Sequence, residues 1–293
     1  MHFSVMKEEV IQRLNPGPCK NFVDCTVGEG GHAMAILERT KPSGKILGVD
    51  CDPVLIERLK LKIEGTDYAN RLILVCDNFA NLRSIVEGHG FGRVSGVLFD
   101  LGFSSWHLEE SRRGFSFLRD EPLDMRYNPQ QNTLTAEAIL NYWSVRDIEQ
   151  VLRVYGEERF SRRIAEEIAR SRPLKTTVDL VMAVERATPA WYHRRRIHFA
   201  TKTFQALRIA VNSELESLAK ALPQALDIME SGGRLIVIAF HSLEDRIVKN
   251  FLREKSKEGV LEILTKKPLR PSKEEIAKNP RSRSARLRAA TKI

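Results

Sequence analysis

The chain has 293 residues, of which 42% are hydrophobic, so it can bury a core large enough for one large domain or two smaller ones. No apolar run approaches the roughly 20 residues that span a bilayer, and the first residues lack the apolar centre of a signal peptide. We therefore expect neither a membrane protein nor a secreted one. The formal net charge of +9 indicates a polyanionic partner.

Four cysteines, at positions 19, 25, 51 and 76, show no C-x-x-C spacing. Each lies in or beside a predicted strand or turn, where a reduced thiol packs as a small apolar group. This pattern favours a cytoplasmic protein, and we predict no metal site.

The segment 21–37, NFVDCTVGEGGHAMAIL, changes from an apolar run to a glycine turn and then to a helical pattern. Asp24 closes the apolar run, and Gly28, Gly30 and Gly31 form the turn. Strand, glycine turn and helix in this order make the first half of a nucleotide-binding βα unit, because a glycine lets the ligand approach the backbone and the helix N-terminus.

Two ligands are compatible with this turn. Gly28, Gly30 and Ala33 satisfy the dinucleotide spacing G-x-G-x-x-G/A. Asp50 ends the next predicted strand, KILGVD (45–50), where a carboxylate holds the hydroxyls of an adenosine ribose. Spacing alone therefore leaves both a dinucleotide and S-adenosylmethionine open.

Acidic residues at the ends of four predicted strands favour S-adenosylmethionine. Asp24, Asp50, Asp77 and Asp100 each follow an apolar run, which puts four carboxylates along the ligand-binding edge of an open sheet. Such an edge suits a cationic sulfonium and its ammonium group, whereas it would repel a pyrophosphate. Solvated acids that cap loops are the alternative explanation for each of them.

Phe79 directly follows Asp77-Asn78 and lies at the start of a predicted helix with Leu82, Ile85 and Val86. An aromatic ring at this position could stack on an adenine, or it could simply pack into the core.

The alternation of strands and helices stops after Asp100. A loop is predicted at 101–110, and 112–129 continue without clear periodicity. Short helices follow, with capping residues at Thr135, Ser144 and Thr176. We predict an inserted helical domain at 106–196, within a methyltransferase-like domain made of 1–105 and 197–293.

The βα pattern then resumes. One long helix is expected from about Ala200 to Ala219, a strand at 234–240, and two further strands at 260–265 and 284–290. Alternating residues predict that the last strand is half-buried, and the basic loop before it is either solvated or in contact with phosphates. The predicted fold class is α/β, with the seven strands of a Rossmann-like methyltransferase.

Long segments of the chain resemble the bacterial family of methyltransferases that modify N4 of a cytidine in the decoding region of small-subunit ribosomal RNA. The resemblance covers nearly the whole chain, in the expected order. It is carried by GEGGH (28–32), DLGFSS (100–105), RRGFSF (112–117), PLDMR (122–126), YGEERFSRRIA (155–165), TKTFQALRIAVNSELE (201–216) and FHSLEDRIVK (240–249).

The resemblance implies a class I fold interrupted by a helical domain, with S-adenosyl-L-methionine as methyl donor and S-adenosylhomocysteine as its product. It implies ribosomal RNA or the small ribosomal subunit as partner, and it leaves both a monomer and a homodimer open. His32 and His107 are implied by the resemblance alone. The donor-binding positions carried over are Gly30, Gly31, His32, Asp50, Phe79, Asp100 and His107.

A cytosine amine is a weak nucleophile, because its lone pair is delocalised into the ring. We hypothesise that Asp100, or the carbonyls of 101–104, accept hydrogen bonds from the amine while Phe103 stacks on the base; donor binding alone is the alternative role for Asp100. Candidate RNA contacts are Arg194, Arg195 and Arg196, beside aromatic residues, and Arg208 and Asn212, on a polar helix stripe.

Three alternatives remain open at this point. The protein could methylate another RNA or DNA amine, or it could be a catalytically silent RNA-binding module that keeps the donor pocket. The glycine pattern alone also permits a dinucleotide oxidoreductase.

Overall fold

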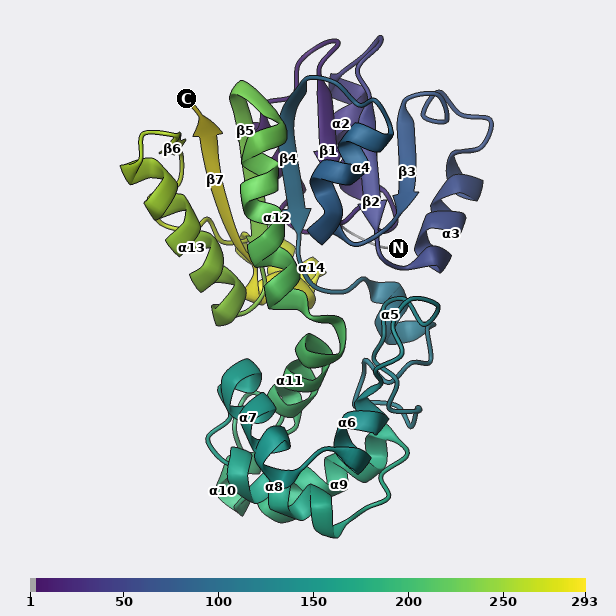
Figure 1. Ribbon diagram of the computed structural model, residues 1–293, viewed down its shortest axis with the longest axis vertical. Coiled ribbons are helices and arrows are strands. Elements are labelled where there is room, and N and C mark those ends of the chain that lie inside the picture. Colours follow the sequence, from purple (N-terminus) through teal and green to yellow (C-terminus); the bar gives the residue numbers. More distant parts are fainter. Residues whose placement is uncertain (1–3) are drawn as a thin grey trace. The chain divides into compact units, whose positions relative to one another are not determined.

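The computed structural model describes residues 4–293, which form two compact units (Figure 1). One unit contains the chain up to Gly102 together with Leu215–Ile293, and the other contains Phe103–Glu214. The observed division thus falls at 102/103 and 214/215, compared with the predicted 105/106 and 196/197. Within the described residues, no helix is both long and apolar enough to cross a membrane.

The first unit is built on one seven-stranded sheet with the order β3-β2-β1-β4-β5-β7-β6. Strands β1 to β5 are parallel, and β7 runs antiparallel to both β5 and β6. The order reverses between β1 and β4, which is where open α/β sheets bind ligands. The strands are β1 (Asn21–Asp24), β2 (Ile46–Asp50), β3 (Leu72–Cys76), β4 (Val94–Asp100), β5 (Met229–Ala239), β6 (Leu261–Ile263) and β7 (Arg286–Lys292).

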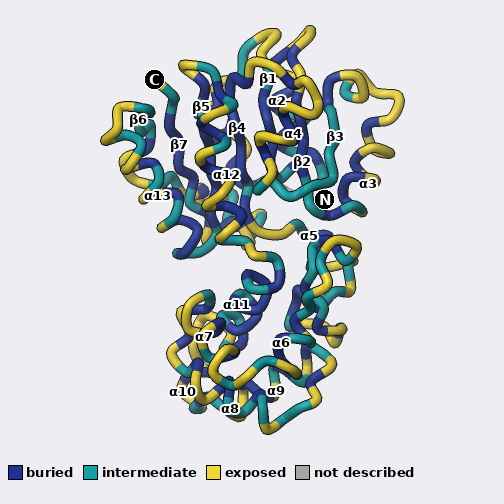
Figure 2. Tube along the Cα trace, viewed as in Figure 1, coloured by how far each residue is buried: buried dark blue, intermediate teal, exposed yellow. Residues whose placement is uncertain are grey.

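Alternating side chains of the central strands fill two separate cores. Phe22 of β1 packs in one core and its neighbour Val23 in the other, because successive strand residues point to opposite faces. Helices α1, α2 and α3 cover one face, and α4, α12 and α13 cover the other, so the central strands are buried on both sides (Figure 2). The helices of this unit are α1 (Lys7–Leu14), α2 (Gly31–Arg39), α3 (Pro53–Ile63), α4 (Leu82–Gly88), α12 (Glu214–Ile228), α13 (Ser242–Lys257) and α14 (Lys273–Lys278).

The prediction of a half-buried last strand is wrong for β7. β7 lies between β5 and β6, and Arg288 is buried although the alternation put it on the solvent side. Arg288 and Arg286 both donate to the Asp245 carboxylate, with Arg288 Nε 2.7 Å from Asp245 Oδ1. Burial raises the pKa of Asp245, but these two guanidinium groups outweigh it and lower the pKa below its ordinary value. The buried arginine is thus tolerated because its charge is paired.

The second unit is a helical bundle around its own apolar core. The predicted caps at Thr135, Ser144 and Thr176 are confirmed; Ala138 N, for example, donates to Thr135 Oγ1 at 3.0 Å. Its helices are α5 (Ser105–Glu109), α6 (Ala136–Tyr142), α7 (Val145–Gly156), α8 (Ser161–Arg170), α9 (Thr177–Ala187), α10 (Ala190–His193) and α11 (Thr201–Asn212).

Two expectations for this region are wrong. The segment predicted as a loop at 101–110 contains the short helix α5, which a capping box between Ser104 and His107 begins. The single helix predicted from about Ala200 to Ala219 is two helices, separated by Ser213 with a left-handed φ of 49°. The apolar periodicity runs through this break, but α11 packs into the core of the helical unit, whereas α12 packs against the sheet.

Candidate active site

The glycine turn links the end of β1 to the N-terminus of α2. Gly28 and Gly30 have φ values of 48° and 81°, which only glycine adopts readily. A Cβ at Gly30 would lie 2.6 Å from Leu59 Cδ1, so the Leu59 side chain of α3 would have to shift to admit one. The turn therefore brings the N-terminus of α2 to the edge of the sheet at which β1 ends, with the Ser4 side chain against Gly31.

The four strand-ending acids lie at the same edge of the sheet, since β1 to β4 are parallel and Asp77 directly follows β3. Two of them brace the turns around them. Asp50 accepts from Gly28 N at 2.9 Å and from Asp52 N at 2.9 Å, while Asp77 accepts from Asn78 N and Asn81 Nδ2. Asp50 thus ties the end of β2 directly to the glycine turn, a structural role in addition to its predicted one.

Asp24, His32 and Asp100 form a polar cluster in which Asp24 and His32 are buried and the Asp100 side chain is partly exposed. His32 Nε2 lies 3.3 Å from Asp100 Oδ2. Asp24 accepts from Thr26 N at 3.1 Å, and Thr26 Oγ1 accepts from Asp100 N at 2.7 Å. Residue patterns offer no reason to select His32, because a single histidine is more often structural.

Electrostatics in this cluster favour a cationic ligand. Burial raises the pKa of Asp24 to about 6, although His32 and the Thr26 N–H oppose the rise, and Asp100 and Asp50 add to it. Burial lowers the pKa of His32, but hydrogen bonding and charge attraction from Asp100 outweigh it and raise the pKa above its ordinary value. The positive charge around Asp24 is therefore too small to compensate the negative charge of its ionised carboxylate.

The polar cluster fits S-adenosylmethionine. Within residues 4–293, Asp100 Oδ1 and His32 Nδ1 are buried atoms without a hydrogen-bond partner. The ammonium group of a ligand would supply both the charge that Asp24 lacks and donors for free carboxylate oxygens. A dinucleotide pyrophosphate would instead bring negative charge beside Asp24 and Asp100.

Phe79 begins a short 3-10 helix, Phe79–Asn81, and is partly buried. Its ring meets Phe99 edge-on, with 5.6 Å between centroids. Part of the ring thus packs into the core, as the simpler interpretation expects, and contact with an adenine stays a prediction.

The helical unit carries its own aromatic cluster near its first residues. His107 is buried between Trp106, Phe115 and Tyr127, with ring centroids 5.0 to 5.2 Å away. His107 Nδ1 accepts from Ser104 N at 3.1 Å, which fixes the orientation of the ring. The ring of Phe103 is more exposed than that of His107, and its centroid lies 6.2 Å from the ring centroid of Phe115.

Arg208 and Asn212, predicted as RNA contacts, are engaged inside the helical unit. Arg208 donates to both carboxylate oxygens of Glu214, at 2.8 and 2.9 Å, and its guanidinium lies 4.5 Å from the ring centroid of Phe103. Asn212 Nδ2 donates to Met125 O, and Asn212 Oδ1 accepts from Tyr127 N. Arg208 is thus placed to hold the Phe103 ring, while Asn212 anchors the loop before α6.

Arg194, Arg195 and Arg196 lie in the turn after α10 and are exposed. In the part of the chain that the structure describes, no carboxylate forms an ion pair with any of the three.

Sequence reasoning passed over Thr26, Glu214 and Glu275. Glu275 of α14 accepts from Met6 N at 2.7 Å, and burial raises its pKa, with Asp100 among the charges that contribute. No sequence signal could select Glu275, which lies in the segment interpreted as a basic loop. Thr26 follows Asp24 by two residues, which is the spacing of a local side-chain turn.

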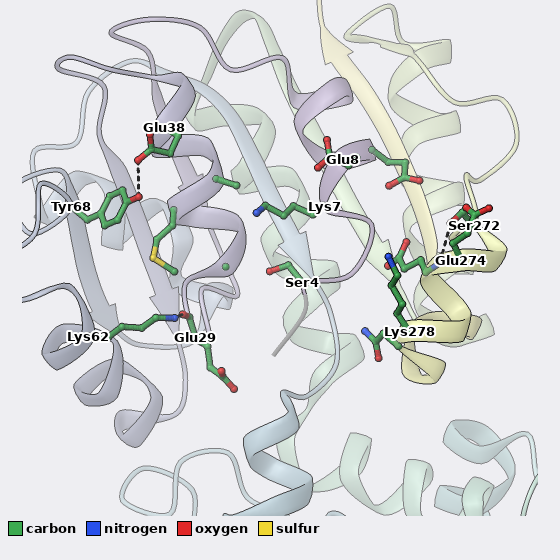
Figure 3. Close-up of a pocket in the computed structure, with 16 residues that line it drawn as sticks. Ser4, Lys7, Glu8, Glu29, Glu38, Lys62, Tyr68, Ser272, Glu274 and Lys278 are labelled. Carbon is green, nitrogen blue, oxygen red and sulfur yellow. Dashed lines mark hydrogen bonds between the residues drawn. The ribbon is translucent and has the colours of Figure 1, made fainter. Parts of the chain in front are cut away.

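A groove of about 760 Å³ runs beside the glycine turn, between α1, α2 and α14 (Figure 3). Its walls combine acidic residues such as Glu8 and Glu274 with Lys7, Lys62 and Lys278. None of the four edge aspartates lines it, so this groove is separate from the polar cluster.

Comparison with known proteins identifies the family. The model of the MraW methylase family matches residues 1–293. The chain is 47% identical to Ribosomal RNA small subunit methyltransferase H of Dehalococcoides mccartyi, over 100% of this chain and 86% of that protein. It is also 47% identical to the protein of the same name from Thermotoga neapolitana, over 99% and 95%. A solved chain from Streptococcus mutans in complex with SAH aligns over 100% of both chains, with a TM-score of 0.48 and 11% identity. The chain therefore belongs to the MraW methylase family.

Proposed function

We propose that this protein transfers a methyl group from S-adenosylmethionine to the exocyclic N4 of a cytidine in small-subunit ribosomal RNA. Membership of the methylase family supports the reaction class, and the relatives' name supports the ribosomal substrate. The observation that carries the proposal in this molecule is the polar cluster of Asp24, His32 and Asp100.

The chain's residues would bind the donor at several points. S-adenosylmethionine, when bound, supplies a methyl group on a positively charged sulfur: the amine nitrogen would bond to the methyl carbon in line, the carbon–sulfur bond would break to leave S-adenosylhomocysteine, and the amine would lose one proton. Asp24 would pair with the ammonium group, and Asp50, which also accepts from Gly28 N and Asp52 N, would accept from the ribose hydroxyls. Phe79 would contact the adenine, while Gly30 would let the donor approach the backbone, and Gly31, which Ser4 contacts, would do so where Ser4 gives way.

Activation of the cytosine amine needs hydrogen-bond acceptors for its N–H groups and a fixed position of the base. A cytosine amine gains nucleophilicity when its N–H groups are held by acceptors that draw it out of conjugation. Among the described residues Asp100 Oδ1 has no hydrogen-bond partner and would be such an acceptor, while His32 Nε2 lies 3.3 Å from the other oxygen of the same carboxylate. Phe103, braced by Arg208, would stack on the base.

The target nucleotide must be unpaired or flipped out, because N4 is engaged in a base pair. The helical unit, with Arg194, Arg195 and Arg196 exposed, is the candidate for holding the RNA around it.

Incubation with small ribosomal subunits and labelled S-adenosylmethionine, followed by nucleoside mapping, tests the function. We expect label on N4 of a cytidine in the ribosomal RNA. Label on another RNA or on DNA would assign the enzyme to a different amine. No transfer to any nucleic acid, with the donor still bound, would favour a silent RNA-binding module. Tighter binding of NAD than of the donor would contradict the proposal altogether.

A further inference from the structure

Helix α10 and the start of α8 together form an exposed aromatic and basic surface on the helical unit. It consists of Phe160 and Trp191 with Arg159 and Arg163, and it continues into the arginines at 194–196. We call it the Trp191 surface. Nothing in the donor chemistry uses it, and the sequence pattern had selected only its second half.

The ring of Trp191 is held in place yet remains open to solvent. It is 53% exposed, and its contacts to Phe160 and Tyr192 are edge-on, with interplanar angles of 60° and 88°. The guanidinium of Arg159 lies 5.8 Å from the centroids of both Trp191 and Phe160. An indole that is supported at its edges and flanked by a cation is ready to stack with a planar partner.

Anchors on both sides hold the segment that carries these groups. Tyr192 OH donates to the buried Glu158 at 2.7 Å, and burial together with this bond raises the pKa of Tyr192 to about 12. Thr188 Oγ1 lies 2.8 Å from His193 Nε2, and the ring of His198 stacks on Phe117 at 4.5 Å. The arginines between these anchors are therefore presented on a fixed turn, which reduces the entropy lost on binding.

The arginines of this surface carry charge that no ion pair among the described residues neutralises. Arg159 and Arg163 are exposed, and across residues 4–293 neither forms an ion pair with a carboxylate. Their neighbour Arg162, in contrast, pairs with Glu166 at 3.1 Å. Glu158, the nearest acidic residue in sequence, is occupied by Tyr192 OH and Phe160 N. The surface thus has charge available for an anionic partner.

From these features we infer that the Trp191 surface binds an unpaired nucleotide of RNA, with a base stacked on Trp191 and the flanking phosphates on the arginines. Single-strand binders combine stacking rings with basic side chains in this way. An acidic peptide would use the arginines but leave the indole without a planar partner. This surface would hold an unpaired stretch other than the target base, and its link to ribosomal RNA rests on the proposed function.

Binding of a labelled oligouridylate of about ten nucleotides, followed by fluorescence anisotropy with the full chain, tests the inference. Trp191→Ala should weaken binding about tenfold, and Trp191→Phe should retain most of the affinity. Replacing Arg159 and Arg163 by Ala should weaken binding and reduce the slope of log K against log salt by about 1.4. The affinity for an RNA duplex of equal length should change little in Trp191→Ala.

Matched controls are available in the same unit. Tyr142 is 85% exposed on α6, and Arg146 and Arg153 are exposed on α7. Tyr142→Ala should leave the affinity within about twofold, and the α7 arginine pair should matter less than Arg159 and Arg163. Melting temperatures show whether Trp191→Ala stays folded. If it does not, the variant in which Arg159 and Arg163 are replaced by Ala still tests the surface, because it retains Trp191.

Equal affinity of folded Trp191→Ala and wild type for the oligouridylate would overturn the inference, as would displacement by polyglutamate as efficient as by unlabelled RNA. Each variant is also assayed for donor binding and for methylation of small subunits. If wild type binds the oligouridylate through Trp191 but methylates no subunit, the proposed function fails and the inference stands. If it methylates subunits while Trp191→Ala binds RNA normally, only the inference fails.

Discussion

Asp24 is the residue whose protonation should control donor affinity. Its carboxyl is 1% exposed, and its pKa is raised to about 6, so it becomes ionised only above that pH. Without ligand, the native state binds a proton that the unfolded state has released between pH 4 and about 6, so stability should fall as pH rises through this range. The ammonium group of the donor prefers the ionised form.

We therefore expect donor affinity to fall as pH drops through about 6, by up to tenfold per unit at lower pH. Calorimetric titration between pH 5 and 8 measures this change. Asp24→Asn should weaken binding at pH 7.5 and remove most of the slope, leaving the part that His32 contributes by gaining positive charge. Asp77→Asn, at the same edge of the sheet, should keep the slope. A wild-type affinity that does not change with pH would contradict this account.

Asp100 has two possible roles, which one substitution separates. Asp100→Asn keeps the size of the side chain but replaces one carboxylate oxygen with an amide donor. If Asp100 activates the acceptor amine, turnover should fall about a hundredfold or more, while the dissociation constant of the donor changes little. Equilibrium binding and single-turnover rates on small subunits measure the two effects. Equal losses in both would restrict Asp100 to donor binding.

At the scale of elements, β7 shows how a buried charge fits inside a sheet. Arg288 and Arg286 share Asp245 of α13, so the pair fixes that helix against the strand. Asp245→Ala should lower the free energy of unfolding by about 3 kcal/mol, because Arg288 stays buried without its partner. Urea unfolding measures the change.

Asp227→Ala, which removes the exposed partner of Arg83, is the matched control and should have little effect. Since the native pKa of Asp245 is lowered, its contribution should be present above about pH 4 and be lost as pH falls through the native value. A loss for Asp245→Ala no greater than for the control would contradict a buried pair.

Most of the fold was predictable because its signals are local. Apolar runs ending in or followed by Asp marked β1, β2, β3 and β4, and α3 likewise begins locally, where Val54 N donates to Asp52 Oδ1. Features that depend on tertiary neighbours were not predictable. The burial of Arg288 depends on Asp245, 43 residues away, and the break at Ser213 depends on which core each half of the pattern joins.

The site was predictable in part for the same reason. Gly30, Asp50 and Asp100 follow from strand ends and turn spacing, whereas His32 and His107 were selected only by resemblance. No pattern within the sequence shows that His32 lies beside Asp100, because His32 belongs to α2, which follows β1, whereas Asp100 ends β4. Glu214 was missed although it holds Arg208, since a glutamate after a helix is ordinary.

For the whole molecule, part of the net charge of +9 lies on the exposed arginines at 194–196. Replacing Arg194, Arg195 and Arg196 together by Ala should weaken binding to ribosomal RNA and reduce the slope of log K against log salt by about 2. Filter binding at several salt concentrations measures this slope. An unchanged slope would remove the 194–196 turn from the RNA interface. The basic segment that begins at Lys266 and contains α14 keeps its charges in this variant and would then be the next candidate.

The helical unit occupies the connection between two neighbouring parallel strands, β4 and β5. Parallel neighbours always need a crossover, and here α12 already provides one. The inserted segment from Phe103 to Glu214 can therefore change in length or sequence without altering any strand pairing. This connection is a graft point: an exchanged insert that retains His107 would redirect methylation toward a different acceptor, while the expected donor-binding residues of the sheet unit stay unchanged.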